Sequence, residues 1–181
     1  MTHENPSNPT DTYNLVSNER LVQRGEATVL PDGYRYGTPA EFDAASIEDL
    51  MRGSFTDEEI WNAYLGTREE DLSQAGMREI DVMIATTDGQ LVGFGNIVAR
   101  NSQGVLNDLI VDPDHRHNGL AQAIVLERLA MADELVISSL YIPPISELNT
   151  LEGFYIEQGF SKQLDSSFVR GPEPKNVLKV V

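Results

Sequence analysis

Apolar residues gather in the middle of the chain as two short runs, residues 81–86 and 91–98, on either side of the turn Thr87-Asp88-Gly89-Gln90. An Asp-Gly pair between two apolar runs is a strong signal for a β-hairpin, because both residues tolerate the left-handed backbone of a tight turn. A third apolar run over residues 105–111 predicts another strand, and it ends at Asp112-Pro113 because proline has no N–H for a strand ladder. The centre of the chain therefore predicts a hairpin followed by a third strand.

The second half of the chain alternates predicted helices with predicted strands. Its first helix is apolar on most faces, so we expect it to be largely buried. The strand after it stops at two successive prolines, and the last helix ends at a glycine, which is the usual residue just past a helix end. These elements are a helix over 119–135, a strand over 136–142, a helix over 146–158, a strand from Phe160, and a last strand over either 168–170 or 177–181.

The first third of the chain has weaker patterns. Residues 1–33 begin with a polar, proline-containing stretch that is typical of a flexible tail, so we place an N-terminal extension at 1–33 and one mixed α/β domain at 34–181. Acidic residues follow the two helix starts, where they favour the helix dipole. The elements predicted here are one or two short strands over 27–30 and 34–36, a helix from Pro39 to Met51, and a helix from Thr56 to Leu65.

Charge and the absence of cysteine exclude several classes of function. Thirteen Lys and Arg stand against 29 Asp and Glu, a formal net charge of −16, which disfavours nucleic acid and anionic membranes as partners. Without cysteine, disulfides, thiol catalysis and Cys-ligated metals are excluded. His115 and His117 have no third ligand nearby in the sequence, so we expect no metal site.

The chain also shows no sign of membrane insertion or export. No apolar run approaches the ~18 residues of a membrane span, and the first residues lack the basic and apolar parts of a signal peptide. We therefore expect a soluble cytoplasmic protein, and its 181 residues fall in the usual range of ~100–200 residues for one domain.

The turn after the third strand carries the clearest candidate chemistry. There the chain passes from Val111 through a charged turn to Gly119, where the buried helix begins. The first N–H groups of a helix have no partner inside it, and together with the helix dipole they form an anion site suited to a pyrophosphate. Gly119 and the small Ala121 let a phosphate approach the backbone, and Arg116 adds a positive charge beside it.

The segment Arg116-His117-Asn118-Gly119-Leu120-Ala121, after a Val-x-Pro strand end, resembles the acyl-CoA signature Arg/Gln-x-x-Gly-x-Gly/Ala of the GNAT N-acetyltransferase superfamily. Two further segments are similar to the family: the hairpin with Leu91-Val92-Gly93-Phe94-Gly95, and the ending Phe154-Tyr155-Ile156-Glu157-Gln158-Gly159-Phe160. The resemblance covers about residues 34–160. It implies a mixed, mostly antiparallel sheet whose fourth and fifth strands splay apart, with helices on both faces.

The resemblance also implies an activity and its residues. It implies transfer of an acetyl group from acetyl-CoA, as a co-substrate, to a primary amine by direct attack, with Tyr155 as the general acid for the departing thiolate. Asp108 lies on the strand near the thioester and is a candidate base acting through water. The residues implied to bind the cofactor are Leu109, Ile110 and Val111 for the pantetheine arm, and Arg116, His117, Asn118, Gly119, Leu120 and Ala121 for the pyrophosphate.

Two positions depart from the family pattern. The family often places an Asn seven residues before this Tyr and an Ala four before it, whereas this chain has Leu148 and Leu151 there, with Asn149 offset by one. We therefore expect no standard cofactor contact from that helix turn. A non-catalytic acyl-CoA-binding sensor or regulatory domain is the alternative that this departure supports.

The sequence leaves the identity of the acceptor open, and the acidic residues allow several interpretations. Residues 41–81 carry twelve acids against three bases, which would attract a cationic amine, either a small molecule or a peptide N-terminus. The same charges also suit a solvated, solubilising face, and a third interpretation is a dedicated partner of a basic protein that binds no CoA. A homodimer through the C-terminal strands is expected by analogy with the family alone.

Overall fold

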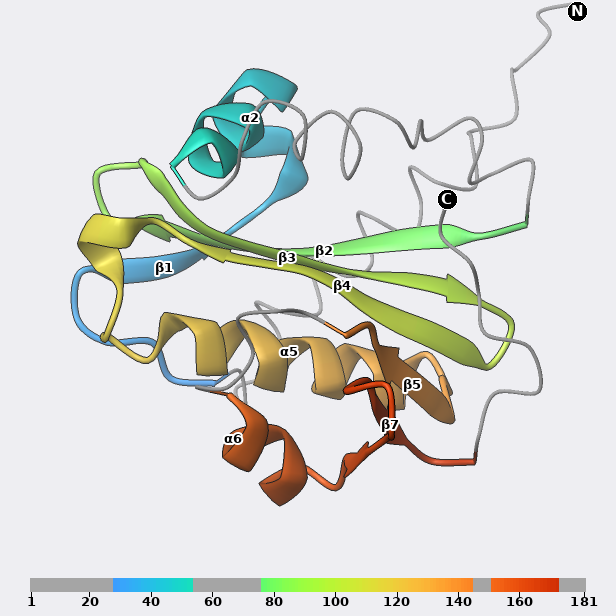
Figure 1. Ribbon diagram of the computed structural model, residues 1–181. Helices are drawn as coiled ribbons and strands as arrows, with labels where there is room; N and C mark the ends of the chain where they lie inside the picture. Colours follow the sequence, from blue (N-terminus) through green and yellow to red (C-terminus); the bar gives the residue numbers. More distant parts are fainter. Residues whose placement is uncertain (1–27, 54–75, 145–150, 173–181) are drawn as a thin grey trace, which may run out of the picture.

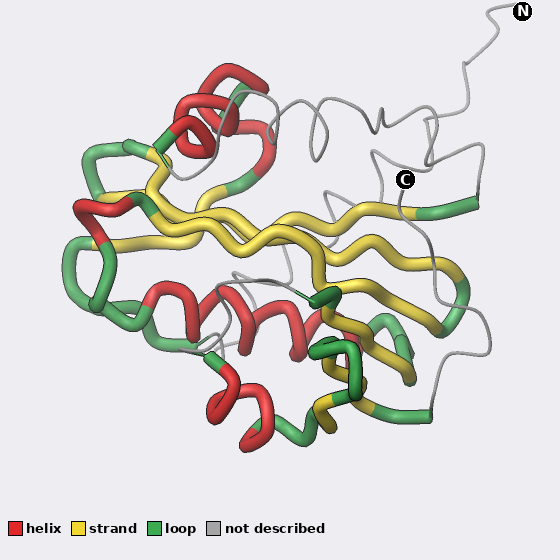
Figure 2. Tube along the Cα trace, in the orientation of Figure 1, coloured by secondary structure: helices red, strands yellow, loops and turns green. Residues whose placement is uncertain are grey.

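The computed structural model describes residues 28–53, 76–144 and 151–172, and at its centre is a seven-stranded sheet (Figures 1 and 2). The strand order across the sheet is β1-β2-β3-β4-β5-β7-β6. Neighbouring strands are antiparallel except for β4 and β5, which are parallel. The strands are β1 (Tyr34–Gly37), β2 (Arg78–Thr86), β3 (Leu91–Arg100), β4 (Gln103–Val111), β5 (Ser139–Ile142), β6 (Ser161–Lys162) and β7 (Phe168–Arg170).

Helices lie on both faces of this sheet (Figure 1). Helix α2 (Ala44–Arg52) packs on one face against β3 and β4, and α5 (Leu120–Glu134) packs on the other face against β2, β3 and β4, on the same side as α6 (Glu152–Glu157). Two short 3₁₀ helices, η1 (Pro39–Glu41) and η3 (Pro113–His115), precede α2 and α5. None of the described helices is long and apolar enough to cross a membrane.

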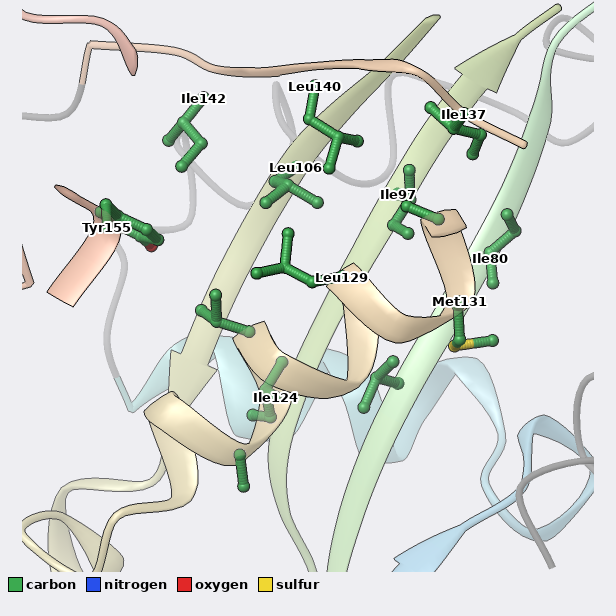
Figure 3. Packing of buried hydrophobic residues seen from close by; sticks show 14 of the residues in the cluster. Ile80, Ile97, Leu106, Ile124, Leu129, Met131, Ile137, Leu140, Ile142 and Tyr155 are labelled. Carbon is green, nitrogen blue, oxygen red and sulfur yellow. The ribbon is translucent and has the colours of Figure 1, made fainter. Parts of the chain in front are cut away.

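The alternation of side chains along the strands divides the core into two layers. Val82 belongs to the cluster on the α5 side, whereas its neighbour Met83 joins Phe94 in the cluster beneath α2. Ile124 and Leu129 of α5 belong to the larger of the two clusters, the one on the α5 side (Figure 3). Each such side chain contributes about 1.5–3 kcal/mol when it is fully buried, so α5 is fixed firmly on the sheet.

The structure confirms the predicted fold class and the central elements. The hairpin of β2 and β3, the third strand β4 and the buried helix α5 all lie within a few residues of their expected bounds. The described residues also bear out the expected mixed, mostly antiparallel sheet with helices on both faces.

The beginning of the domain agrees with the sequence only in part. Of the one or two short strands expected over 27–30 and 34–36, the structure has one, β1, and residues 28–30 form no strand. The helix expected from Pro39 is divided into η1 and α2, because Asp43 starts a new helix: its carboxylate accepts the N–H of Ser46 at 2.9 Å.

The later elements are shorter than expected. The strand predicted over 136–142 begins only at Ser139, because Val136 has a φ of 58°, a left-handed conformation that a strand cannot contain. Of the two alternatives for the last strand, Phe168–Arg170 is the one observed. The helix expected over 56–65, the first part of the one expected over 146–158, and residues 177–181 lie outside the described residues.

Candidate active site

The candidate site begins where β4 and β5 separate. The two strands pair only over Gln103–Val105 and Ser139–Tyr141. Beyond Val105, β4 continues to Val111 with no hydrogen-bonded strand on its β5 side in the described part of the chain. Since backbone N–H and C=O groups need partners, this open edge can accept an extended molecule as if it were a strand.

A bulge in β4 lies at the start of the open edge. Gly95 of β3 pairs with Leu109 and the next residue, Asn96, pairs with Asn107, so Asp108 is an extra residue without a partner. Its φ of 24° departs from strand geometry. An extra residue bends its strand and increases the local twist, and this bend lies three residues beyond Val105, where the pairing of β4 with β5 ends.

The Arg128 side chain, which comes from α5, fills the space behind the bulge. It is 1% exposed, and its Nη1 donates hydrogen bonds to the carbonyl oxygens of Asn96 (3.1 Å), Asn107 (2.6 Å) and Asp108 (2.8 Å). Burial lowers the pKa of Arg128 to about 10, against the opposing effects of Tyr155 and Asp108. The guanidinium therefore keeps its positive charge at neutral pH.

Two other titratable groups lie within the electrostatic reach of this charge. Burial raises the pKa of Asp108 from 3.8 to about 6, and the charge of Arg128 partly offsets that increase. Burial also raises the pKa of Tyr155, and Arg128 again acts in the opposite direction. Asp108 is therefore largely ionised at neutral pH and can accept a proton, whereas Tyr155 is protonated and can donate one.

Tyr155 is held in an aromatic cluster on the α5 side of the sheet. The residue is 2% exposed, and its ring centroid lies 5.7 Å from that of Phe160 and 5.6 Å from that of Phe168. Figure 3 shows it at the edge of the core cluster, on the side of Leu106 and Leu129. The sequence therefore placed Tyr155 on the expected helix, but the structure gives it a far more enclosed position than a surface helix would.

The loop that leads into α5 presents backbone amides to one open region. His117 and Gly119 both have left-handed φ values, 65° and 77°, and such turns direct successive N–H groups to the same side. The first hydrogen bond of α5 runs from Ala123 N–H to the Gly119 carbonyl at 3.0 Å, so the amides of residues 120–122 precede it. A Cβ added to Gly119 would meet nothing within 4 Å, which leaves this space open for a ligand.

A small polar cluster holds this loop against β1. The Tyr34 hydroxyl lies 3.1 Å from His115 Nδ1, and Asn118 Nδ2 donates to that hydroxyl at 3.2 Å and to the His115 carbonyl at 3.1 Å. Sequence reasoning missed Tyr34, because nothing in the sequence connects it with residues 81 positions away. The cluster fixes the loop without using the amides that face the open region.

Arg116 reinforces the same strand end. Its Nε donates to the carbonyl of Val111 at 3.1 Å, so the side chain ties the loop to the last residue of β4. This contact takes up the carbonyl of one residue that the sequence analysis reserved for the pantetheine arm. Asp112 N–H donates to the Val92 carbonyl at 2.9 Å, and hydrogen-bonded pairs alternate along an antiparallel ladder, so the backbone groups of Ile110 face its partner Phe94 on β3. The N–H and C=O of Leu109 and the N–H of Val111 therefore remain on the open edge.

The structure thus brings most of the expected site residues into one continuous segment, from the bulge through the open edge and the loop into α5. Tyr155 approaches this segment from α6 and shares the electrostatic field of Arg128 with Asp108. Asn149 and Leu148 lie outside the described residues. Of the acidic residues over 41–81, Glu41 pairs with Arg35 at 2.7 Å and Asp43 caps α2, which are structural roles.

Comparisons with known proteins concern the family and the fold. Residues 78–162 match the family model of the acetyltransferase (GNAT) domain. Similar solved structures include the PaiA N-acetyltransferase from Thermoplasma acidophilum in complex with coenzyme A, with a TM-score of 0.58 and 17% identity over 75% of this chain and 96% of that chain.

Two structures from Escherichia coli are similar to the same extent. The GNAT family N-acetyltransferase YhbS in complex with CoA has a TM-score of 0.57 and 20% identity, over 79% of this chain and 82% of that chain. The ribosomal-protein-S18-alanine N-acetyltransferase has a TM-score of 0.56 and 12% identity, over 80% of this chain and 98% of that chain. At these identities the similarity shows the fold, and no curated protein matches the chain in sequence.

Proposed function

We propose, from the match of residues 78–162 to the GNAT acetyltransferase domain model, that the chain is a GNAT enzyme and transfers an acetyl group from acetyl-CoA to a primary amine by direct attack. The observation that carries the proposal is the open edge of β4 beyond Val105, which leads directly to the loop of free amides at the start of α5. The chain thereby offers a strand edge and an anion site in sequence, which is the order of the amide-containing arm and the pyrophosphate in coenzyme A.

The residues present fit that molecule. The open space beside Gly119 and the amides of residues 120–122 suit a pyrophosphate, since helix N-termini favour negative charge. Leu109, through its N–H and C=O, and Val111, through its N–H, can pair with the amides of the pantetheine arm, as an added strand would. Acetyl-CoA supplies the activated acetyl group as a thioester, and the protein provides its position and the movement of protons.

Two side chains of the site have chemistry suited to those proton movements. Asp108, largely ionised at neutral pH, accepts through water a proton from the attacking ammonium group. The free amine then forms a C–N bond with the thioester carbon. As the C–S bond breaks, its electron pair stays on the sulfur and Tyr155 donates its hydroxyl proton there, and the surplus proton on the nitrogen returns to the Tyr155 phenolate. Neither step uses a covalent intermediate on the enzyme, which agrees with a chain that contains no cysteine.

Calorimetric titration of acetyl-CoA and of free CoA tests the binding site. The wild type is expected to bind with micromolar affinity, and Gly119→Arg should abolish binding because the side chain fills the space beside the amides. Gly76→Arg is a matched control: Gly76 also has a left-handed φ, 68° against 77° for Gly119, and open space around its Cβ. It precedes β2, whose first residue pairs near the end of β3, far from the loop.

The two variants separate a local effect from strain. If both lose binding, backbone strain rather than the occupied space explains the loss, and the proposed pyrophosphate site is wrong. If the folded wild type binds neither molecule, the acyltransferase proposal and the sensor alternative both fail. The partner of a basic protein then becomes the better hypothesis.

A turnover assay separates the enzyme from the sensor. The near-complete burial of Tyr155 favours the sensor to some degree, because a general acid must reach the leaving group. Release of free thiol from acetyl-CoA, measured across a panel of small-molecule amines and peptides with free N-termini, is expected for an enzyme. Tight binding with no thiol release above the uncatalysed rate for any amine would identify a sensor.

A further inference from the structure

We propose that Arg128 is a positioning residue for acyl transfer: its buried guanidinium holds the β4 bulge open and supplies the positive charge that faces both Asp108 and Tyr155. This inference rests on the proposed function, and it adds a residue that the sequence analysis did not single out. We assign Arg128 no contact with the substrate, because it acts on the reacting groups through Asp108 and Tyr155.

The hydrogen bonds show what the side chain does to the backbone. A bulge leaves carbonyl groups without partners in the strand ladder, and a buried carbonyl without a partner costs about 1–3 kcal/mol. One nitrogen of Arg128 serves the carbonyls of Asn107 and Asp108 on β4 and that of Asn96 on β3. The guanidinium therefore satisfies the groups that the bulge exposes and holds Asp108 in its irregular conformation.

The neighbouring glycine shows that the site is built around this side chain. A Cβ at Gly95 would lie 2.7 Å from Ile124 Cγ2, 3.0 Å from the Asp108 carbonyl oxygen and 3.3 Å from Arg128 Cζ. Only glycine gives α5 and its guanidinium this access to the sheet. The close approach of α5 to the bulge thus depends on three separate positions in the sequence, Gly95, Asp108 and Arg128.

The charge of Arg128 needs an explanation beyond the hydrogen bonds. Burying a cation is expensive, and a neutral amide could donate to the same carbonyls. The titratable groups that face Arg128 are Asp108 from β4 and Tyr155 from α6, whereas β2 contributes aliphatic residues to this side of the sheet and β3 contributes Gly95 and the Asn96 carbonyl. Both facing groups carry a negative charge at some stage of the proposed reaction.

The reaction makes use of a fixed cation in this position. When Tyr155 gives its proton to the sulfur, the tyrosine becomes a phenolate inside the protein, and a buried anion without a partner is strongly unfavourable. The positive charge of Arg128 stabilises that phenolate until it takes up a proton again. The same charge keeps Asp108 ionised at lower pH, so that one guanidinium supports both the acid and the base.

Two substitutions separate the charge from the shape. Arg128→Gln keeps an N–H donor for the carbonyls but removes the charge, whereas Arg128→Lys keeps the charge on a different donor group. Near-UV circular dichroism shows whether each variant is folded. The kinetic readouts are kcat, KM for acetyl-CoA and the dependence of kcat on pH, and a calorimetric titration gives the Kd for acetyl-CoA.

We expect Arg128→Gln to lower kcat about tenfold or more, since a loss of one pKa unit of stabilisation corresponds to a factor of ten, while Kd changes less. Both limbs of its pH profile should move to higher pH, because the pKa values of Asp108 and Tyr155 rise without the cation. Arg128→Lys should restore the limbs toward their wild-type positions. A folded Arg128→Gln with wild-type kcat and limbs, or a Lys variant impaired in the same way as the Gln variant, would overturn the proposal.

A titration without substrate keeps this test separate from the proposed function. The carboxyl carbon of Asp108, followed by NMR in ligand-free protein, should titrate about one unit or more higher in Arg128→Gln than in the wild type, the range expected for removal of a neighbouring opposite charge. An unchanged titration refutes the inference even if the wild type turns over. If the expected difference in titration is seen but the wild type shows no turnover, the proposed function is refuted, and Arg128 remains the charge that lowers the pKa of Asp108.

Discussion

Replacement of Asp108 by Asn should stabilise the protein relative to wild type at neutral pH, and this advantage should shrink as the pH falls. Burial raises the pKa of Asp108 to about 6 from its ordinary value of 3.8, so the folded state prefers the protonated carboxyl. The stability that this preference contributes is fully present below pH 3.8 and is lost as the pH rises through about 6. Asparagine resembles the protonated form in shape and accepts the positive φ at this position better than most residues.

The size of the effect follows from the shift. A difference of about two pKa units corresponds to about 3 kcal/mol at pH 8, at ~1.4 kcal/mol per unit. About half of that loss has already occurred at pH 5, because the unfolded carboxyl ionises first. The advantage of Asp108→Asn over wild type in free energy of unfolding should therefore grow by about 1–1.5 kcal/mol between pH 5 and pH 8.

Urea unfolding at both pH values, followed by circular dichroism, measures this difference. Asp49→Asn is the matched control, since Asp49 is an exposed residue of α2; the change measured for it is subtracted to remove the general effect of losing one negative charge. The prediction concerns the change with pH, so a constant cost of the substitution does not affect it. If the advantage of Asp108→Asn is the same at pH 5 and pH 8, Asp108 is not the desolvated carboxylate that the structure indicates.

Three further substitutions test other parts of the site. Gly95→Ala should lower the free energy of unfolding by about 1–3 kcal/mol in urea titrations, because its Cβ would lie 2.7 Å from Ile124 Cγ2; an unchanged midpoint would show that α5 moves away at no cost. Tyr34→Phe removes the hydroxyl shared by His115 and Asn118, so calorimetry should show CoA binding weakened several-fold and the free energy of unfolding should fall by about 1 kcal/mol. An unchanged affinity for CoA would mean that other contacts hold the loop in place. Tyr155→Phe should lower kcat about 100-fold or more with an unchanged Kd for acetyl-CoA, whereas wild-type kcat would assign Tyr155 to the core alone.

The sequence predicted those parts of the fold that depend on local patterns. The hairpin around Asp88-Gly89 and the buried helix α5 follow from turn chemistry and from apolar periodicity, which act over a few residues. The loop at Gly119 was predicted for the same reason, since a strand end followed by a glycine and a helix places amides in a known arrangement. In each case the signal and the structure involve the same short segment.

The remaining features depend on contacts between distant segments. The bulge at Asp108 arises from the register between β3 and β4, and a strand sequence does not show where a register shifts. Arg128 appears in the sequence as one charged residue of an apolar helix, and only the packing of α5 on the sheet shows that it reaches three carbonyls. The late start of β5 likewise results from the left-handed Val136, a β-branched residue that local propensity would place in a strand.

Helix α5 connects the two ends of the proposed site, and this connection limits how the site can vary. Gly119 begins the helix beside the free amides, and Arg128 lies nine positions later at the bulge, which is about 13 Å along the helix axis at 1.5 Å per residue. The open edge of β4 runs back between the same two points, from the loop to Asp108. The helix therefore sets the distance between the anion site and the residues proposed for proton transfer. A change in the packing of α5, at Ile124 or Gly95, should alter binding and turnover together, because one rigid element positions both.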